Sequence, residues 1–169
     1  MYKVYQKIIL ACLLLVMTGT VYSQRVTQTI NDGWKFSLFE GDASTADFDI
    51  SGWTDVSIPH TWNAKDADDE IPGYFRGKGW YRKVVTVEEL IPEQRVYLSF
   101  EGANQETNVF VNGTFVGNHK GGYSAFTFDV TDYVHAGRNL IAVSVDNSHH
   151  PDIAPLSADF TFFGGIYRD

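Results

Sequence analysis

The pattern of hydrophobic and polar positions predicts a chain built from β-strands. Val96, Leu98 and Phe100 occupy alternate positions, which is the period of a strand with one buried face. Residues 123–130 repeat the same period. Residues 139–147 have apolar side chains on both faces, as in a central strand of a sandwich. These segments therefore predict both one-sided and central strands.

Turn signals divide these strands at intervals of about ten residues. Asn112-Gly113 joins two short β-rich runs and supplies the two positive φ values of a type I′ hairpin turn. Only residues 44–49 and 130–137 could form helical turns, and both segments are short. We expect an all-β domain, an antiparallel β-sandwich of the jelly-roll kind, over residues 24–169.

The N-terminal residues have the pattern of a secretory signal peptide. Lys3 and Lys7 precede an apolar run over 8–16, and small or neutral residues follow it. The apolar run is too short to span a membrane. We predict a signal peptide over 1–23, and hence a periplasmic or secreted protein with no membrane attachment after cleavage.

Composition restricts the class of protein further. The chain has 169 residues, of which 44% are hydrophobic, enough for one globular domain with a core. Removing Lys3 and Lys7 with the signal peptide changes the formal net charge from −8 to −10. Such an acidic domain has no electrostatic basis for binding nucleic acid or anionic lipid. Cys12 is the only cysteine, so packing and not disulfides must stabilise the mature chain.

Candidate chemical groups are few. No G-x-S-x-G nucleophile motif occurs, and no two glutamates stand out as the carboxyl pair of a retaining glycosidase. The acidic run from Asp66 to Glu70 lacks the glycine turn of a calcium loop. His149 and His150 are adjacent and would point in opposite directions in an extended segment. We interpret both as polar loops, and His60 as a hydrogen-bonded loop histidine.

Five motifs in order resemble the N-terminal sugar-binding domain of glycoside hydrolase family 2, the family of β-galactosidases, β-glucuronidases and β-mannosidases. They are INDGWKF at 30–36, VSIPHTWN at 56–63, GWYRK at 79–83, VNGTFVGNHKGGYSAFTFDVTDYV at 111–134 and FGGIYRD at 163–169. Together they extend over essentially the whole mature chain.

The resemblance implies a function that this chain does not complete alone. In the family, the jelly roll leads into an immunoglobulin-like domain and a (β/α)8 barrel that carries the acid/base and nucleophile glutamates. We therefore expect this chain to be a truncated piece of an exported glycosidase that hydrolyses β-glycosides, most plausibly β-galactosides, with retention. Its expected partners are the carbohydrate substrate and the two downstream domains.

Two site residues follow from the same resemblance. In similar enzymes an aspartate at the position of Asp159 reaches into the active site of the barrel and contacts the sugar. In some β-galactosidases it also contacts a sodium ion, so Asp159 is the candidate metal ligand too. Arg76 occupies the position where some β-galactosidases have a sugar-contacting asparagine, which puts galactose specificity in question.

Other interpretations of the same residues remain open. Asp159 could instead cap a turn before Phe160. The chain could be a stand-alone, non-catalytic carbohydrate-binding or surface-interaction module, or a purely structural sandwich. The four tryptophans are expected in the core between two sheets. The apolar residues of the final segment, Phe160, Phe162, Phe163 and Tyr167, are expected to be exposed where a further domain would cover them.

Overall fold

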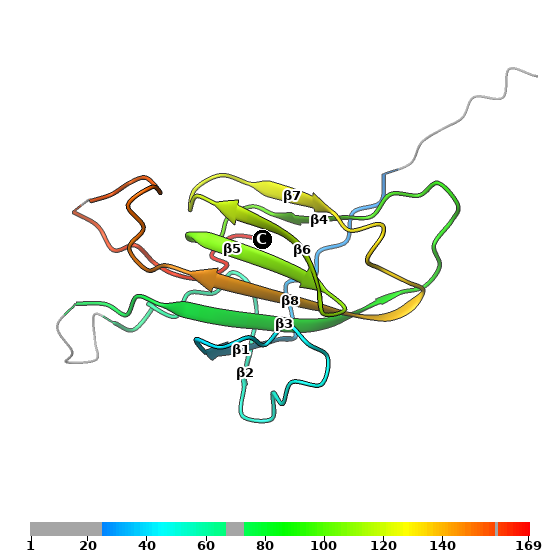
Figure 1. Ribbon diagram of the computed structural model, residues 1–169, viewed down its shortest axis with the longest axis horizontal. Helices are drawn as coiled ribbons and strands as arrows, with labels where there is room; N and C mark the ends of the chain where they lie inside the picture. The colour runs from blue at the N-terminus through cyan, green and yellow to red at the C-terminus, as the bar shows by residue number, and fades with distance from the viewer. Residues whose placement is uncertain (1–24, 67–72, 158) are drawn as a thin grey trace, which may run out of the picture.

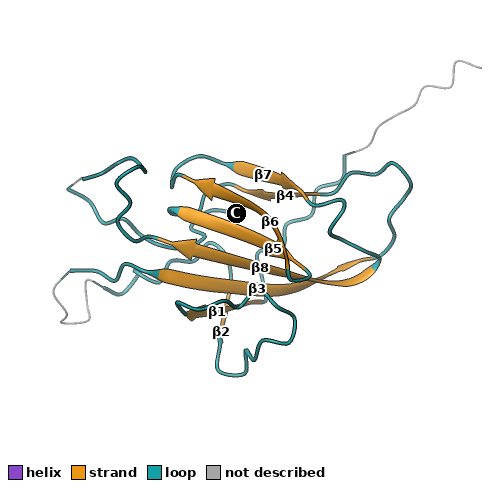
Figure 2. Cartoon of the chain, in the orientation of Figure 1, coloured by secondary structure: helices purple, strands orange, loops and turns teal. Residues whose placement is uncertain are grey.

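All regular secondary structure in the part of the chain that the structure describes is β-strand (Figure 2). The computed structural model describes residues 25–66, 73–157 and 159–169, so the predicted signal peptide and Asp68, Asp69 and Glu70 lie outside the described residues. The strands are β1 (Trp34–Leu38), β2 (Thr54–Val56), β3 (Lys78–Val87), β4 (Tyr97–Phe100), β5 (Glu106–Val111), β6 (Thr114–Lys120), β7 (Phe126–Asp129) and β8 (Gly137–Asp146). The segments at 44–49 and 130–137 form turns without a helix. A search of the described part of the chain for a helix able to cross a membrane finds none.

The strands form two layers, as the all-β jelly-roll prediction requires (Figure 1). Six strands make one antiparallel sheet in the order β2-β1-β3-β8-β5-β6, and β4 pairs with β7 in a second sheet that covers it. The longest strands, β3 and β8, pair along ten residues in the middle of the large sheet. The prediction that residues 139–147 form a central strand is confirmed.

The hairpin between β5 and β6 turns at the predicted place. Asn112 has a φ of 52° and Gly113 a φ of 81°, so both positions of the turn lie in the left-handed region. The Asn112 side chain also accepts a hydrogen bond from the Leu140 amide at 2.9 Å. The turn is therefore bound to β8 as well as to its own strands.

The main core lies between the two layers. Leu98 and Phe100 of β4 pack with Val109 of β5 and Val143 of β8, and all four are buried. Trp34 and Tyr81 extend this core toward β1 and β3, and their rings meet edge to face at 6.5 Å. Apolar burial of this size explains how a chain without a second cysteine holds a sandwich together.

A second, smaller cluster lies on the outer face of the large sheet. Trp80 is 3% exposed there and packs with Ala43 and with Phe48 of the loop between β1 and β2. Its indole nitrogen donates to the Gly41 carbonyl at 3.0 Å. The expectation that all four tryptophans fill the space between the sheets is thus wrong, because this loop folds back and gives Trp80 a separate apolar site.

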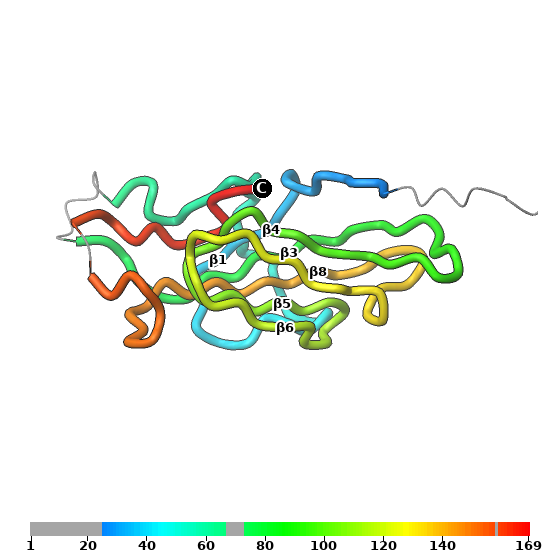
Figure 3. The backbone as a smooth tube through the Cα atoms, turned by 90° about the horizontal axis from the view of Figure 1, so that it is seen from above, coloured from blue at the N-terminus to red at the C-terminus, as the bar shows by residue number. Residues whose placement is uncertain are grey.

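Two long connections leave the sandwich at one end. The loop between β2 and β3 and the segment after β8 extend from the same end of the sandwich (Figures 1 and 3). The last described residue returns to the body of the domain, where Asn31 donates to Asp169 at 2.9 Å. Residues 31 and 169, far apart in the sequence, therefore meet in the folded domain.

Candidate functional site

Two buried asparagines join the loops at this end. Asn63 follows β2, Asn147 follows β8, and both side chains are at most 2% exposed. The side-chain oxygen of Asn63 accepts from the Gly164 amide at 2.6 Å and from the Asn147 side-chain nitrogen at 3.3 Å. The Asn147 side chain accepts from the Gly77 amide at 2.8 Å and donates to the Phe162 carbonyl at 2.9 Å. These contacts fix three loop segments relative to one another.

Asp66 completes this network. Its Oδ2 atom accepts from the Asn63 side chain at 2.6 Å and from the Phe75 amide at 2.8 Å. One carboxylate oxygen of the acidic run thus holds the turn that leads into β3. The sequence suggested a polar, solvated loop for this run, but Asp66 is bonded within the network.

Arg76 is held rigidly between backbone and aromatic rings. Its Nε donates to the Asn147 carbonyl at 2.7 Å, and its guanidinium carbon lies 5.1 Å from the centre of the Phe162 ring and 5.9 Å from that of Tyr74. None of the ion pairs among the described residues involves Arg76. The site therefore contains a fixed positive charge that has no carboxylate partner among the described residues.

Asp159 is exposed on the segment that Phe162 anchors. Its neighbour Phe160 is 51% exposed and packs on the Phe162 ring at 5.3 Å. Among the described residues, no hydrogen bond or ion pair uses the Asp159 carboxylate. The Asp159 side chain is thus exposed at the same end as Arg76, and none of the described residues is its partner in a turn cap.

The apolar residues of the final segment differ from expectation. Phe160 and Phe163 are exposed as predicted, but Phe162 is only 6% exposed and Tyr167 is half-buried. Phe162 is buried because its carbonyl is held by Asn147 and its ring lies under Arg76. The exposed part of this segment is smaller than the sequence indicated.

The glycine pair of FGGIYRD is required by close packing. A Cβ atom on Gly164 would overlap the Trp62 ring, and one on Gly165, whose φ is +123°, would overlap the His60 carbonyl. Only glycine fits both positions. This contact brings the motifs at 56–63 and 163–169 together.

His60 is the hydrogen-bonded loop histidine that we expected. Its Nδ1 lies 2.8 Å from the Tyr81 hydroxyl, and its backbone amide donates to the Ile166 carbonyl at 2.8 Å. Burial lowers the pKa of His60, and burial raises the pKa of Tyr81, with the Ile166 contact opposing the rise. Both shifts favour the neutral forms, and the hydrogen bond between the two side chains joins the loop to β3 inside the scaffold.

The described residues do not form a metal site on their own. No group of three His, Cys, Asp or Glu side chains gathers within 25–66, 73–157 and 159–169. His149 is exposed, and His150 Nε2 lies 3.3 Å from a carboxylate oxygen of Glu106. Asp159 offers a cation a single carboxylate, which is too few ligands for a sodium site.

The described chain is thus a β-sandwich with Asp159 exposed and Arg76 held by its neighbours at one end. Residues 27–169 match the family described as "Glycosyl hydrolases family 2, sugar binding domain". The chain belongs to this family.

Individual relatives agree with this assignment. Over 92% of its residues, this chain is 38% identical to a Bacteroides fragilis β-glucuronidase. Over 85% of its residues, it is 40% identical to a Thermoanaerobacter pseudethanolicus β-galactosidase. A crystal structure of a Bacteroides uniformis β-glucuronidase superposes with a TM-score of 0.79 at 47% identity, over 86% of this chain and 17% of that one. The chain spans about a fifth of the length of the curated relatives that it matches.

Sequence reasoning missed Asn63 and Asn147. Both stand where a strand or motif ends, at the close of VSIPHTWN and just after β8. A polar amide next to tryptophan or at the end of an apolar strand is a sign of a buried side chain that binds backbone groups. That sign does not say which backbone groups it binds.

Proposed function

We propose that this chain is the sugar-binding domain of an exported glycosidase that hydrolyses β-glycosides with retention. In this proposal Asp159 contacts the substrate, and the acid/base and nucleophile carboxylates come from a barrel domain outside this chain. The observation that carries the proposal is the family match over 27–169, at whose end Asp159 is exposed on an anchored segment. A carboxylate there can accept hydrogen bonds from sugar hydroxyls.

The proposed substrate class is the β-galactosides, with the β-glucuronides as a second candidate. Relatives with both names match this chain at similar identity. Arg76 favours the second candidate, because a fixed guanidinium without a carboxylate partner among the described residues suits the anionic group of a uronic acid.

Export is part of the same proposal and rests on the N-terminal pattern of residues 1–23. Expression in a bacterial host, followed by fractionation and mass spectrometry, tests it. A periplasmic or secreted product that begins at Gln24 supports export. A cytoplasmic product that retains residue 1 contradicts it.

The competing function is a stand-alone carbohydrate-binding or surface-interaction module. The test compares this chain with a protein in which it is joined to the immunoglobulin-like and barrel domains of a relative. Both are assayed on aryl β-galactosides, β-glucuronides and β-mannosides. If only the joined protein is active, and replacing its barrel glutamates abolishes that activity, the result supports the glycosidase. An inactive joined protein, together with sugar binding by the chain alone, supports the module.

A further inference from the structure

A row of four charged residues crosses the outer face of the large sheet. In the strand register, Lys78 of β3 stands opposite Asp146 of β8, Asp146 opposite Glu106 of β5, and Glu106 opposite Lys120 of β6. The two carboxylates are therefore direct neighbours in the middle of the row. Like charges in this position destabilise a sheet unless other groups compensate them.

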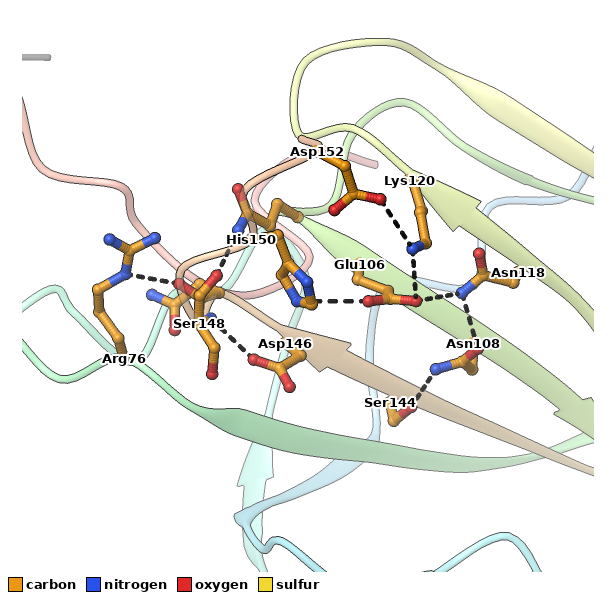
Figure 4. Close-up of polar contacts among 12 residues, drawn as sticks. Arg76, Glu106, Asn108, Asn118, Lys120, Ser144, Asp146, Ser148, His150 and Asp152 are labelled. Carbon is orange, nitrogen blue, oxygen red and sulfur yellow. Dashed lines mark hydrogen bonds and ion pairs between the residues drawn. The ribbon is translucent and has the colours of Figure 1, made fainter. Parts of the chain in front are cut away.

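The compensating groups gather around Glu106 (Figure 4). The Asn118 side chain donates to its Oε1 at 3.0 Å, and Lys120 Nζ lies 3.8 Å from the same atom. His150 Nε2 approaches Oε2 to 3.3 Å. The Glu106 side chain is only 21% exposed, so it is partly shielded from water. Asn118 and Lys120 belong to the sheet, but His150 belongs to the segment after β8.

An ion pair and a hydrogen bond also bind the same segment. Asp152 lies 3.5 Å from Lys120, and the Gln105 side chain donates to the Ser148 carbonyl. Ile153, the next residue after Asp152, is 5% exposed. Residues 147–157 are therefore held by the Asp152–Lys120 ion pair, by the hydrogen bond from Gln105, which precedes β5, and by the contact of His150 with Glu106.

This bound segment leads directly to the candidate sugar contact. Asp159 follows it, and the chain is fixed again at Phe162, whose carbonyl accepts from Asn147. Asp159 is exposed between these two anchors and has no polar partner of its own among the described residues. The position of its carboxylate thus depends on how the two anchors hold the segment.

We propose that Glu106 and Lys120 are positioning residues that hold Asp159 in place through His150 and Asp152. This role rests on the proposed function, in which Asp159 contacts the sugar. Exposed ion pairs contribute little to global stability, and Lys120 and Asp152 are 46% and 65% exposed. Loss of the Lys120–Asp152 pair or of the His150–Glu106 contact therefore loosens the segment locally while the sandwich stays folded.

The first test is a double-mutant cycle in the joined enzyme. Glu106→Gln and Lys120→Met each lower kcat/KM by about two- to fivefold. Lys120→Arg, which keeps the charge, restores activity. In an Asp159→Asn background, neither substitution lowers kcat/KM further, because the carboxylate that they position is no longer present. Asp55→Asn, which breaks the Lys35–Asp55 ion pair at the other edge of the sheet, is the matched control and leaves kcat/KM unchanged.

Equal losses in the two backgrounds, or no loss in either, overturn the positioning role. The first result would show that Glu106 and Lys120 act on activity independently of Asp159. The second would show that the contacts of Glu106 and Lys120 with the segment do not influence the site.

The second test uses the 169-residue chain itself and does not depend on activity. A nitroxide label at Leu156→Cys, in a Cys12→Ser background, reports the mobility of the segment. Glu106→Gln and Lys120→Met increase that mobility, and Asp55→Asn does not. Unchanged mobility in the first two variants overturns the proposal even where Asp159→Asn lowers activity. If Asp159→Asn instead leaves kcat/KM unchanged, the proposed function fails, and the positioning role fails with it, whatever the label reports.

Discussion

Asn147 donates a hydrogen bond to Asn63 across 84 positions of the sequence, at 3.3 Å, inside the protein. The pair lies where the loop after β2 meets the segment after β8. Each amide also binds backbone groups of the segments that carry Arg76 and Phe162. A buried amide that satisfies several backbone groups fixes loop positions more strictly than apolar packing alone.

Replacing Asn147 by alanine tests the importance of this pair. The substitution leaves the Gly77 amide and the Phe162 carbonyl without their partner, and each buried unsatisfied group costs about 1–3 kcal/mol. We expect the free energy of unfolding to fall by roughly 3 kcal/mol in urea titrations. The control Asn31→Ala removes an exposed hydrogen bond and changes the free energy of unfolding by less than about 0.5 kcal/mol. Equal losses in the two variants would show that the buried network adds no stability.

A glycine substitution tests the contact between the motifs. Gly165→Ala combines a positive φ with a Cβ that would overlap the His60 carbonyl, so the backbone must move. We expect a loss of about 3 kcal/mol or more in the free energy of unfolding. Gly52→Ala is the matched control, since nothing lies within 4 Å of its added Cβ and its φ is not in the left-handed region. A Gly165→Ala protein as stable as the control would contradict the close approach of the two segments.

The pH dependence of stability follows from two partly buried histidines. Burial lowers the pKa of His60 and of His119 relative to the ordinary value of 6.5. The unfolded chain then binds more protons just below that value, so stability is fully present above about pH 6.5 and falls as the pH decreases toward the folded-state pKa values. Urea unfolding between about pH 5 and 7.5 measures this slope. His60→Gln flattens the slope and leaves the part due to His119. A slope of opposite sign in the parent chain would contradict the burial of both rings.

Local patterns predicted the strands, the hairpin turn at Asn112-Gly113 and the central position of β8. Each depends on residues close in sequence, through the two-residue period or through backbone preference. Trp80 was misplaced because its burial depends on Phe48, which a loop brings back over the outer face. The period of hydrophobic residues does not show that a loop folds back over a strand. Tertiary contacts of this kind decide which face of an alternating strand is covered.

The candidate site was predictable only in part, for the same physical reason. Asp159 and Arg76 were named through resemblance to a family, and their roles remain predictions. The contacts that hold Arg76, through Asn147 and Phe162, join segments more than 70 residues apart. A sequence pattern cannot give such contacts, because side-chain to backbone bonds between loops have no fixed spacing.

Arg76 provides a test of substrate class. In the joined enzyme, Arg76→Gln removes a fixed charge that could pair with a uronic acid carboxylate, and a hydrogen bond between charged groups is worth about 1.5–3 kcal/mol. We expect kcat/KM on an aryl β-glucuronide to fall by roughly ten- to a hundredfold, and on an aryl β-galactoside by less than about threefold. Arg138→Gln, at the far end of β8, makes the same change of charge as a control. Equal losses on both substrates would remove the argument for glucuronides.

Asp159→Asn tests the substrate contact itself. In the joined enzyme, the carboxylate would lie in a pocket closed by the barrel, where exclusion of water strengthens its hydrogen bonds to sugar hydroxyls. The substitution keeps the size of the side chain and removes its charge, so kcat/KM should fall by roughly ten- to a thousandfold. The melting temperature should stay nearly constant, because Asp159 is exposed and bonds to none of the other described residues. The isolated chain should bind galactose no better than about millimolar, with or without the substitution, since one such contact in water contributes only about 1 kcal/mol. Unfolding of the Asp159→Asn domain with unchanged activity of the surviving enzyme would identify Asp159 as a structural residue.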